Sequence, residues 1–310
     1  MRRFPRVSII GAGVVGNTLG RALRRRGYPV VSVISRSQRH ARALARAVGS
    51  PVASTSLADL SPGTELLLIS SPDEAIPGIA RKAAGIRTLD FRGMVAVHCS
   101  GARSSGLLAP LKRRGARTGS FHPLQTFPRG QSHRKLQSRL RGISYGIEGE
   151  NSALAPLRRI VRDLGGRPVV VRRGRKPLYH VACVFGSNYI LALLGILASL
   201  SRRAGLPGTW NAAFGPLVTA TVENGLARNA GDVLTGPVVR RDFRTVDLHL
   251  RSLRASAPEY LGFYALAGAQ IARMAARRDR SHAGEFRRLE SRLLKLVNDR
   301  PVRKTSEVKR

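Results

Sequence analysis

The sequence has 310 residues, of which 43% are hydrophobic, so it can bury a core and is neither disordered nor collagen-like. It carries 54 Lys and Arg, 47 of them Arg, against 18 Asp and Glu, a formal net charge of +36. A charge of this size suggests a polyanion partner, but the basic residues are spread along the chain and aromatic content is only 5%. We therefore disfavour nucleic acid as a partner.

Two cysteines, Cys99 and Cys183, exclude a disulfide scaffold, and no His/Cys spacing suggests a metal site. The N-terminus lacks a cleavage-like ending, which favours a cytoplasmic protein. One uncharged run, Val181–Ser201, is long enough to be a membrane candidate. Because it contains polar residues and glycines, we interpret it as the buried core helix of a protein without membrane contact.

Short β-branched runs alternate with helical stretches over the first part of the chain. Strands are predicted at 7–10, 30–34, 65–70, 94–98, 117–121, 143–147 and 168–171, with helices at 17–26 and 38–48. Continuous apolar strands separated by helices indicate a parallel sheet covered on both faces. Helices then follow at 176–204, 209–229, 245–255, 259–278 and 285–297. We predict an α/β domain over 1–174, a helical substrate and dimerisation domain over 175–299, and a basic tail over 300–310.

A glycine-rich turn follows the first predicted strand and opens a helix. Gly11, Gly13 and Gly16 there form the GxGxxG spacing of a dinucleotide-binding turn. The first glycine makes the tight turn, the second lets a pyrophosphate approach the backbone, and the third allows close helix packing. The helix N-terminus would hold the phosphates. The predicted cofactor contacts of this turn are Gly11, Ala12, Gly13, Val14, Val15 and Gly16.

The end of the second predicted strand bears on which dinucleotide binds. NAD sites usually offer an acidic residue about 20 residues beyond the turn. This sequence has Ser35, Arg36 and Ser37 there, and its first acidic residue is Asp59. Because an arginine between hydroxyls suits a 2′-phosphate, we predict NADP in preference to NAD. The alternative is that Arg36 is an ordinary solvated charge in an arginine-rich chain.

Five segments together give the sequence a family resemblance. They are the glycine turn, ELLLISSPDEAI (65–76), VHCSGA (97–102), SFHPLQTF (120–127) and KPLYHVACVFGSNY (176–189). Over roughly residues 5–275 the sequence resembles a family in which a Rossmann-like NADP-binding domain precedes a helical domain of unknown function. Members are described as NADP- or F420-dependent oxidoreductases, so the resemblance leaves coenzyme F420 open as a redox partner.

The family is similar in architecture to 6-phosphogluconate and 3-hydroxyisobutyrate dehydrogenases and to pyrroline-5-carboxylate reductase. This likeness implies a Rossmann parallel-sheet domain followed by an all-helical, 6-phosphogluconate-dehydrogenase-like C-terminal domain. It also implies that Ser70 and Pro72 lie along the cofactor, and that Ser100 and Gly101 contact substrate near the nicotinamide. A simple turn is the alternative for the latter pair. Asp73 is expected to cap a helix.

Four further side chains are candidates for the chemistry. His122 ends a predicted strand and could donate a proton. Lys176 and His180 are four residues apart and share one helix face. The resembled dehydrogenases have an acid/base lysine followed by asparagine at this spacing, so His180 is a departure from their pattern. A solvated position is the alternative for Lys176. Asn188, expected to be buried, could hydrogen-bond substrate.

Arg240 could bind a substrate carboxylate, and Cys99 is expected to be buried and inert. Taken together, the residues predict an NADP-dependent oxidoreductase that transfers hydride between the nicotinamide and a small carbonyl, imine or hydroxyacid-type substrate between the two domains. A non-catalytic NADP sensor or scaffold is the alternative, because a fold does not fix a function. Exposed apolar helix faces, such as Tyr260–Tyr264, predict a homodimer.

Overall fold

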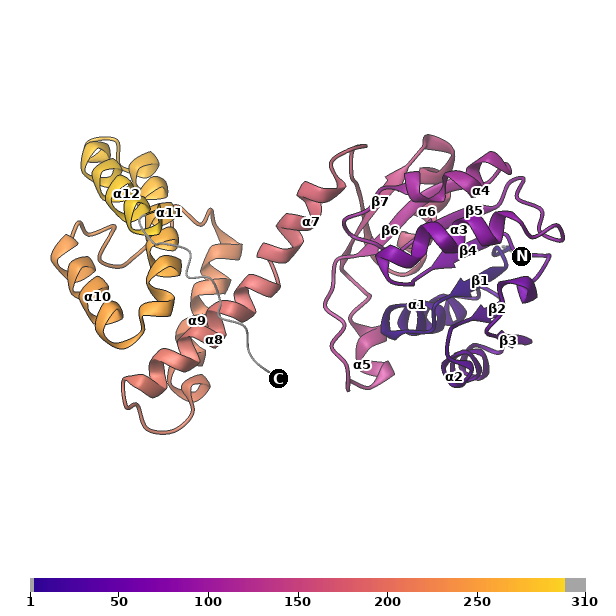
Figure 1. Ribbon diagram of the computed structural model, residues 1–310, viewed down its shortest axis with the longest axis horizontal. Coiled ribbons are helices and arrows are strands. Elements are labelled where there is room, and N and C mark those ends of the chain that lie inside the picture. The colour runs from indigo at the N-terminus through magenta and orange to yellow at the C-terminus, as the bar shows by residue number, and fades with distance from the viewer. Residues whose placement is uncertain (1–2, 299–310) are drawn as a thin grey trace, which may run out of the picture. The chain divides into compact units, whose positions relative to one another are not determined.

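The computed structural model describes residues 3–298, and the chain divides into two compact units (Figure 1). The first runs to Tyr189 and the second begins at Ile190. Each unit is described here by itself. The predicted basic tail, 300–310, lies outside the described residues.

Within residues 3–298 the first unit contains one eight-stranded sheet in the order β3-β2-β1-β4-β5-β6-β7-β8. The strands are β1 (Val7–Ile10), β2 (Val30–Ile34), β3 (Val52–Ser54), β4 (Leu66–Ile69), β5 (Val95–His98), β6 (Arg117–Pro123), β7 (Ser144–Gly149) and β8 (Arg167–Val170). All neighbours pair in parallel except β6 and β7, in which Phe121 lies opposite Ile147 in an antiparallel register. The sheet is therefore mostly parallel, in agreement with the predicted parallel-sheet domain, and the last two strands, β7 and β8, run opposite to the others.

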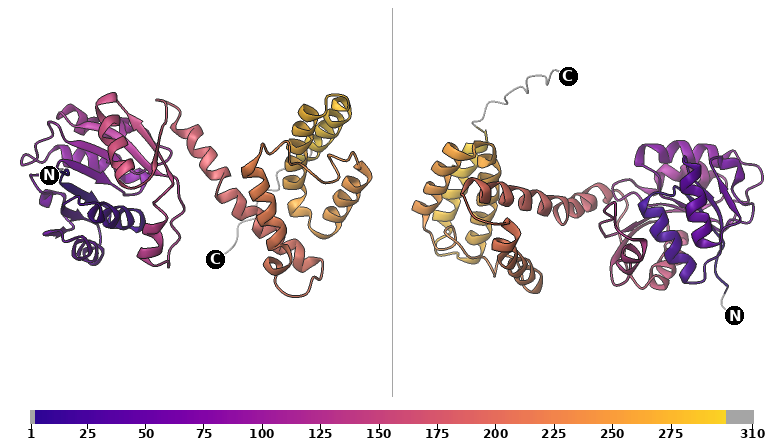
Figure 2. Two further views of the ribbon diagram at one scale, coloured as in Figure 1. Left: turned by 180° about the vertical axis from the view of Figure 1, so that it is seen from behind. Right: turned by 90° about the horizontal axis from the view of Figure 1, so that it is seen from below.

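Helices cover both faces of this sheet, as predicted. The helices are α1 (Val14–Arg25), α2 (Gln38–Val48), α3 (Ile76–Ala84), α4 (Ala109–Arg113), α5 (His133–Ser138) and α6 (Asn151–Asp163). On one face, Leu19, Leu44 and Leu157 bring α1, α2 and α6 into one buried cluster with β1. On the other face, Ile76 and Leu111 bring α3 and α4 into a second cluster. Figure 2 shows the helices on the two sides of the sheet.

The order of the strands creates a switch point between β1 and β4. The chain moves outward from β1 to β2 and β3, then returns to pair β4 with the other side of β1. Loops that follow these two strands leave in opposite directions, and in open α/β sheets ligands bind in the crevice between such loops. The fold therefore directs attention to the residues after β1 and β4, and then to those after β5 and β6.

The helix α7 (Lys176–Phe185) follows the sheet, and a turn at Gly186 and Ser187 separates it from α8 (Asn188–Arg203). The long helix predicted over 176–204 is thus interrupted once. The second unit continues with α9 (Trp210–Ala227), α10 (Phe243–Ser256), α11 (Leu261–Arg278) and α12 (Ala283–Asn298). Its core comes from the last three of these helices, where Leu250, Ala269 and Leu289 belong to one buried cluster.

The expectation that 181–201 is a buried core helix is wrong for the single chain. By length and composition, 176–203 is apolar enough to cross a membrane, and none of its most apolar window is buried. Among the described residues, Lys176 is the one buried residue in α7 and Ser201 the one in α8, and α9 has none. These three helices therefore present a largely uncovered apolar surface.

Candidate active site

The glycine turn between β1 and α1 has the geometry that its spacing predicts. Gly11 has a φ of +101°, and a Cβ there would lie 2.8 Å from the backbone oxygen of Ser70. A Cβ on Gly16 would collide with the Gly11 carbonyl oxygen and the Ser70 hydroxyl. Gly11 is thus required by its backbone conformation and Gly16 by close packing.

Gly13 differs from its two neighbours in the motif. A Cβ built on it meets nothing within 4 Å among the described residues. Gly13 is also the N-cap of α1, and within the described chain no side chain caps this helix and no acidic residue lies in its first turn. Among the described residues, no hydrogen bond to a residue outside α1 uses the first amides of this helix, at Val14, Val15 and Gly16, which lie at the positive end of the helix dipole. The buried Ala12 completes the turn.

The residues that follow β2 differ in whether their polar groups are already bonded within the protein. Ser37 caps α2, accepting a hydrogen bond from the amide of His40 at 3.3 Å, and the amide of Ser35 donates to the Ser54 carbonyl at 3.0 Å. Arg36 is exposed, and no ion pair joins it to any residue within 3–298. Its guanidinium is therefore available to a ligand, whereas Ser37 already has a structural role.

The loop after β4 connects the turn to a second group of polar residues. Ser70 donates from its hydroxyl to the Gly11 carbonyl at 2.7 Å. Pro72 precedes a short 3-10 helix, Asp73–Ala75, that leads into α3. Asp73 was expected to cap a helix; instead Pro72 occupies that position, and the Asp73 carboxylate accepts from the hydroxyl of Ser100 at 2.7 Å. The capping prediction is wrong because this carboxylate reaches across to the next loop.

Ser100, after β5, is buried and makes hydrogen bonds with four other residues. Its hydroxyl donates to Asp73 and accepts from the amide of Arg103 at 3.0 Å, and its amide lies 3.2 Å from Nδ1 of His98. Its carbonyl accepts a hydrogen bond from Nζ of Lys176 at 2.9 Å. The Ser100 hydroxyl is therefore used within the protein, and the residue holds Lys176 in place.

Lys176, at the start of α7, is fully buried, with 0% of its surface exposed. The alternative of a solvated residue is therefore wrong. Burial is the main cause that lowers the pKa of Lys176 to about 8, with Glu148 the leading opposing influence. Its ammonium also lies 5.3 Å from the centre of the Tyr179 ring. A lysine with a pKa this close to neutrality can give up and regain a proton.

His122, near the end of β6, faces the same group. Its Nδ1 lies 2.9 Å from the hydroxyl of Tyr179, and its ring meets that of His180 edge-on with centres 6.1 Å apart. Burial, followed by the charge of Lys176, lowers the pKa of His122 to about 4, so the imidazole is neutral at physiological pH. A Cβ on Gly101 would lie 2.5 Å from the His180 ring and 2.9 Å from Nε2 of His122. The absence of a side chain at Gly101 therefore lets both rings approach.

Burial also sets the state of the neighbouring thiol. It raises the pKa of Cys99 to about 12, so the thiol stays protonated, in agreement with the inert role expected for this residue. Burial likewise raises the pKa of Tyr179 well above the usual tyrosine range.

Two other candidates are exposed in the single chain. Asn188 is exposed, so its expected burial is wrong for the single chain, and its side-chain oxygen accepts from the Ser187 hydroxyl at 2.9 Å. Arg240 is exposed in the second unit, and its role in binding a substrate stays a prediction.

Three residues of the cluster were missed as site residues from the sequence. Tyr179 lies three positions after Lys176, which places it on the same helical face, and that spacing was a usable signal. Asp73 and Glu148 gave no such signal, because their contacts are made across strands. Glu148, on β7, is buried and accepts bonds from the amide and hydroxyl of Ser105 at 2.7 and 3.1 Å.

The mostly parallel sheet, the switch point and the glycine turn define the first unit as a Rossmann-like domain. Family models agree: a Rossmann-like domain matches residues 2–123, and a domain of unknown function, DUF2520, matches 143–271. The chain thus combines a Rossmann-like domain with a DUF2520 domain. No curated protein matches it.

Solved structures with the same fold extend this result. A "putative NADP oxidoreductase" from Bacteroides fragilis is 26% identical, with a TM-score of 0.69 over 86% of this chain and 98% of that one. An imine reductase from a Pseudomonas species is 20% identical, with a TM-score of 0.61 over 88% and 98%. A pyrroline-5-carboxylate reductase from Coxiella burnetii is 14% identical, with a TM-score of 0.54 over 96% and 98%. The imine reductase and the pyrroline-5-carboxylate reductase are less than 25% identical to this chain, so their similarity shows the fold alone.

Proposed function

We propose that this protein is an NADP-dependent oxidoreductase that transfers hydride between the nicotinamide and a small carbonyl, imine or hydroxyacid-type substrate. The observation that carries the proposal is a buried lysine with a lowered pKa, Lys176, linked to the glycine turn through the loops that follow β4 and β5. Ser70 bonds the turn, Asp73 bonds Ser100, and Ser100 bonds Lys176. The matched structures that are described as oxidoreductases support the same class.

The residues of the turn fit a dinucleotide. The open space beside Gly13 and the uncapped amides of α1 would receive the pyrophosphate. Arg36, exposed and without an ion-pair partner among the described residues, would bind the 2′-phosphate that distinguishes NADP. When bound, the cofactor would supply a hydride donor or acceptor at its nicotinamide.

The protein's own part in the reaction would be to move a proton and orient the substrate. With a pKa of about 8, Lys176 is mostly protonated at neutral pH, so it can protonate the substrate oxygen or nitrogen during reduction and accept the proton in reverse. Neutral His122, fixed by Tyr179, would orient the substrate beside Gly101. The carbonyl of Ser100 holds the lysine, which makes Ser100 a positioning residue in this scheme.

The cofactor assignment is tested by binding of NADPH to Gly13→Leu, with Gly78→Leu as the control. Gly13 has a negative φ and open space beside it, so the substitution leaves the fold intact but fills the phosphate position. Gly78, on α3, also has open surroundings among the described residues. We expect at least about a tenfold weaker affinity for Gly13→Leu and no change for Gly78→Leu. An unaltered dissociation constant in Gly13→Leu contradicts the assignment.

A measurement of NADPH oxidation distinguishes an enzyme from a non-catalytic sensor. NADPH oxidation is followed against a panel of small ketones, oxoacids and cyclic imines, for the wild type and for Lys176→Met. We expect reduction that declines as pH rises through about 8, because Lys176 then loses the proton it must donate, and a fall of about a hundredfold or more in Lys176→Met. NADPH binding without oxidation across the panel supports the non-catalytic sensor instead.

We also propose that the active form is a homodimer in which a second copy covers α7, α8 and α9. The support is the exposure of large apolar side chains on all three helices, including Phe185, Leu191 and Leu226. Exposed apolar surface of this extent marks a protein or membrane contact.

A further inference from the structure

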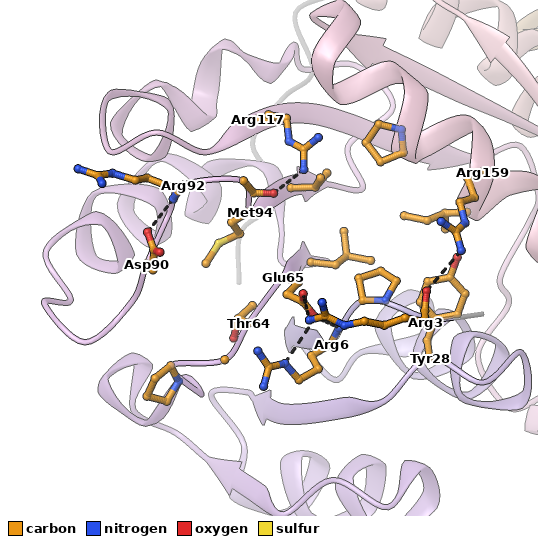
Figure 3. A pocket seen from close by; sticks show the side chains of 18 residues that line it. Arg3, Arg6, Tyr28, Thr64, Glu65, Asp90, Arg92, Met94, Arg117 and Arg159 are labelled. Atoms are coloured by element: carbon orange, nitrogen blue, oxygen red, sulfur yellow. Dashed lines mark hydrogen bonds and ion pairs between the residues drawn. The ribbon is translucent and has the colours of Figure 1, made fainter. Parts of the chain in front are cut away.

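A cavity of the first unit lies away from the residues discussed so far. It encloses about 600 Å³ and is lined by the segments that precede β1, β4 and β5, by the start of β6, and by α6 (Figure 3). Because β1, β4, β5 and β6 run in parallel, these segments meet at the amino edge of the sheet. The glycine turn and Lys176 belong to the opposite, carboxyl edge. The cavity is therefore a separate feature of the same unit.

The wall of this cavity combines apolar side chains with arginines. Leu66, Met94, Val95 and Ile160 contribute apolar surface, and the ring of Tyr28 adds an aromatic one. Among the described residues, five arginines line the cavity against two carboxylates. A cavity of a few hundred Å³ with an apolar wall and a few charged groups has the character of a small-molecule site.

Several of these charges are already used within the protein. Glu65 accepts from Nη2 of Arg3 at 2.6 Å, and the backbone amide of Arg6 donates to it at 3.0 Å, so the carboxylate is neutralised locally. Asp90 accepts from the backbone amide of Arg92 at 2.9 Å. Figure 3 shows the Arg92 side chain extending away from the cavity centre, so it is not part of the proposed contact.

Arg117 and Arg159 line the cavity without a carboxylate closer than 4.0 Å among the described residues. Arg117, the first residue of β6, donates from Nη2 to the Gly93 carbonyl at 2.5 Å, but its Nε is buried with no hydrogen-bond partner among the described residues. Within residues 3–298, the contacts of Arg159, on α6, are long: 3.4 Å from Nη2 to the Arg3 carbonyl and 4.0 Å from Nε to Asp163. A buried guanidinium N–H without an acceptor is costly, and a bound anion would satisfy it.

We propose that this cavity binds a small phosphate ester, with the phosphate on Arg117 and Arg159 and an apolar or aromatic body against the wall. Arginine suits this role because its fork of N–H donors matches phosphate oxygens in pairs. Free phosphate would leave most of the volume and the apolar wall unused. The site is independent of the NADP-dependent reaction, since it shares no residue with the glycine turn or the Lys176 cluster.

The test is calorimetric titration with naphthyl phosphate, which carries both parts of the expected ligand. Inorganic phosphate and naphthol serve as the two half-ligands, and an excess of NADP⁺ is present in a parallel series. We expect naphthyl phosphate to bind more tightly than either half-ligand, and NADP⁺ to leave its affinity unchanged. Affinity should fall about tenfold or more in Arg117→Ala and in Arg159→Ala.

The control variants distinguish loss of the binding site from misfolding of a variant and from the loss of any positive charge. Arg159→Ala removes an exposed side chain that makes no short contact with the described residues, so it tests the site even if Arg117→Ala folds poorly. Arg158→Ala removes an exposed arginine from the adjacent position on α6, outside the cavity lining, and should bind like the wild type. Equal loss in Arg158→Ala, displacement by NADP⁺, or undiminished binding in both Arg117→Ala and Arg159→Ala overturns the proposal.

Discussion

At the scale of single residues, the first unit holds a buried lysine, Lys176, and a half-buried histidine, His122, with shifted pKa values. Burial lowers the pKa of Lys176 to about 8 and that of His122 to about 4. The two values are far apart, so at pH 7 one group carries a proton to give and the other is neutral. Pairs of titratable groups separated in this way are typical of sites that perform acid–base chemistry.

The low pKa of His122 has a consequence for stability. An unfolded histidine titrates near pH 6.5, so between about pH 6.5 and 4 the unfolded chain binds a proton that the folded chain excludes. The free energy of unfolding should therefore be unaffected by His122 above pH 6.5 and decrease as pH falls toward 4, by up to about 3 kcal/mol.

Urea unfolding of the wild type and of His122→Gln between pH 7 and 4.5 measures this contribution. We expect a smaller loss of stability on acidification in His122→Gln. Part of the loss should remain, because burial also lowers the pKa of His98. His40→Gln, at an exposed position on α2, should retain the wild-type dependence. A His122→Gln profile parallel to the wild type contradicts the argument.

Site residues could be predicted from the sequence where they are close together along the chain. Gly11, Gly13 and Gly16 follow from a motif within six residues; the positive φ of Gly11 and the close packing at Gly16 agree with that motif, and the cofactor contacts stay a prediction. The contact between Asp73 and Ser100 joins residues 27 positions apart across two strands. No periodicity encodes such a contact, so it could be found only from the folded chain.

At the scale of secondary-structure elements, most strands and helices could be predicted from the sequence, because runs of apolar residues determine them. The exceptions have physical reasons. β3, which was not predicted, has three residues and only partial burial, so it carries little apolar signal. The reversed direction of β7 and β8 was not predicted, because an apolar run has the same appearance in either direction. The burial of α7 and α8 was misjudged because apolar sequence shows that a surface needs cover and not what provides it.

Substitution of Leu191 tests what covers these helices. Leu191 lies on α8 and is 65% exposed in the single chain. Leu191→Arg should therefore cost little within one chain but should place a charge in the proposed dimer contact. We expect the wild type to sediment as a dimer and Leu191→Arg to shift toward monomer at equal concentration.

Gln270→Arg, which adds the same charge at an exposed position on α11, is the control and should remain dimeric. A wild-type monomer that co-sediments with lipid vesicles contradicts the dimer and supports a membrane contact for the helix at 176–203.

The net charge of +36 affects the whole molecule. Many acidic side chains are already paired, as Glu65 is with Arg3, Glu259 with Arg203 and Glu290 with Arg273. With 54 basic residues and 18 acidic ones, most arginines must repel one another. Such repulsion destabilises a compact chain and is screened by salt.

The unfolding temperature should therefore rise with sodium chloride and level off at roughly 0.2 M, where the screening length is below about 10 Å. Differential scanning fluorimetry at increasing salt measures the change. Sodium sulfate at matched ionic strength, as a divalent anion, reveals any specific anion binding beyond screening. A temperature that falls with salt would show that the surface ion pairs outweigh the repulsion.

The position of Lys176 at the first residue of α7 links two properties that are otherwise unrelated. Lys176, Tyr179 and His180 all belong to the opening turns of a helix whose remaining surface is apolar and uncovered in the single chain. If Lys176 is the proton donor, as proposed, the rigidity of its position would depend on whether that helix is covered. Dilution of the protein would then reduce the specific activity of each molecule, so that catalysis itself would report on self-association.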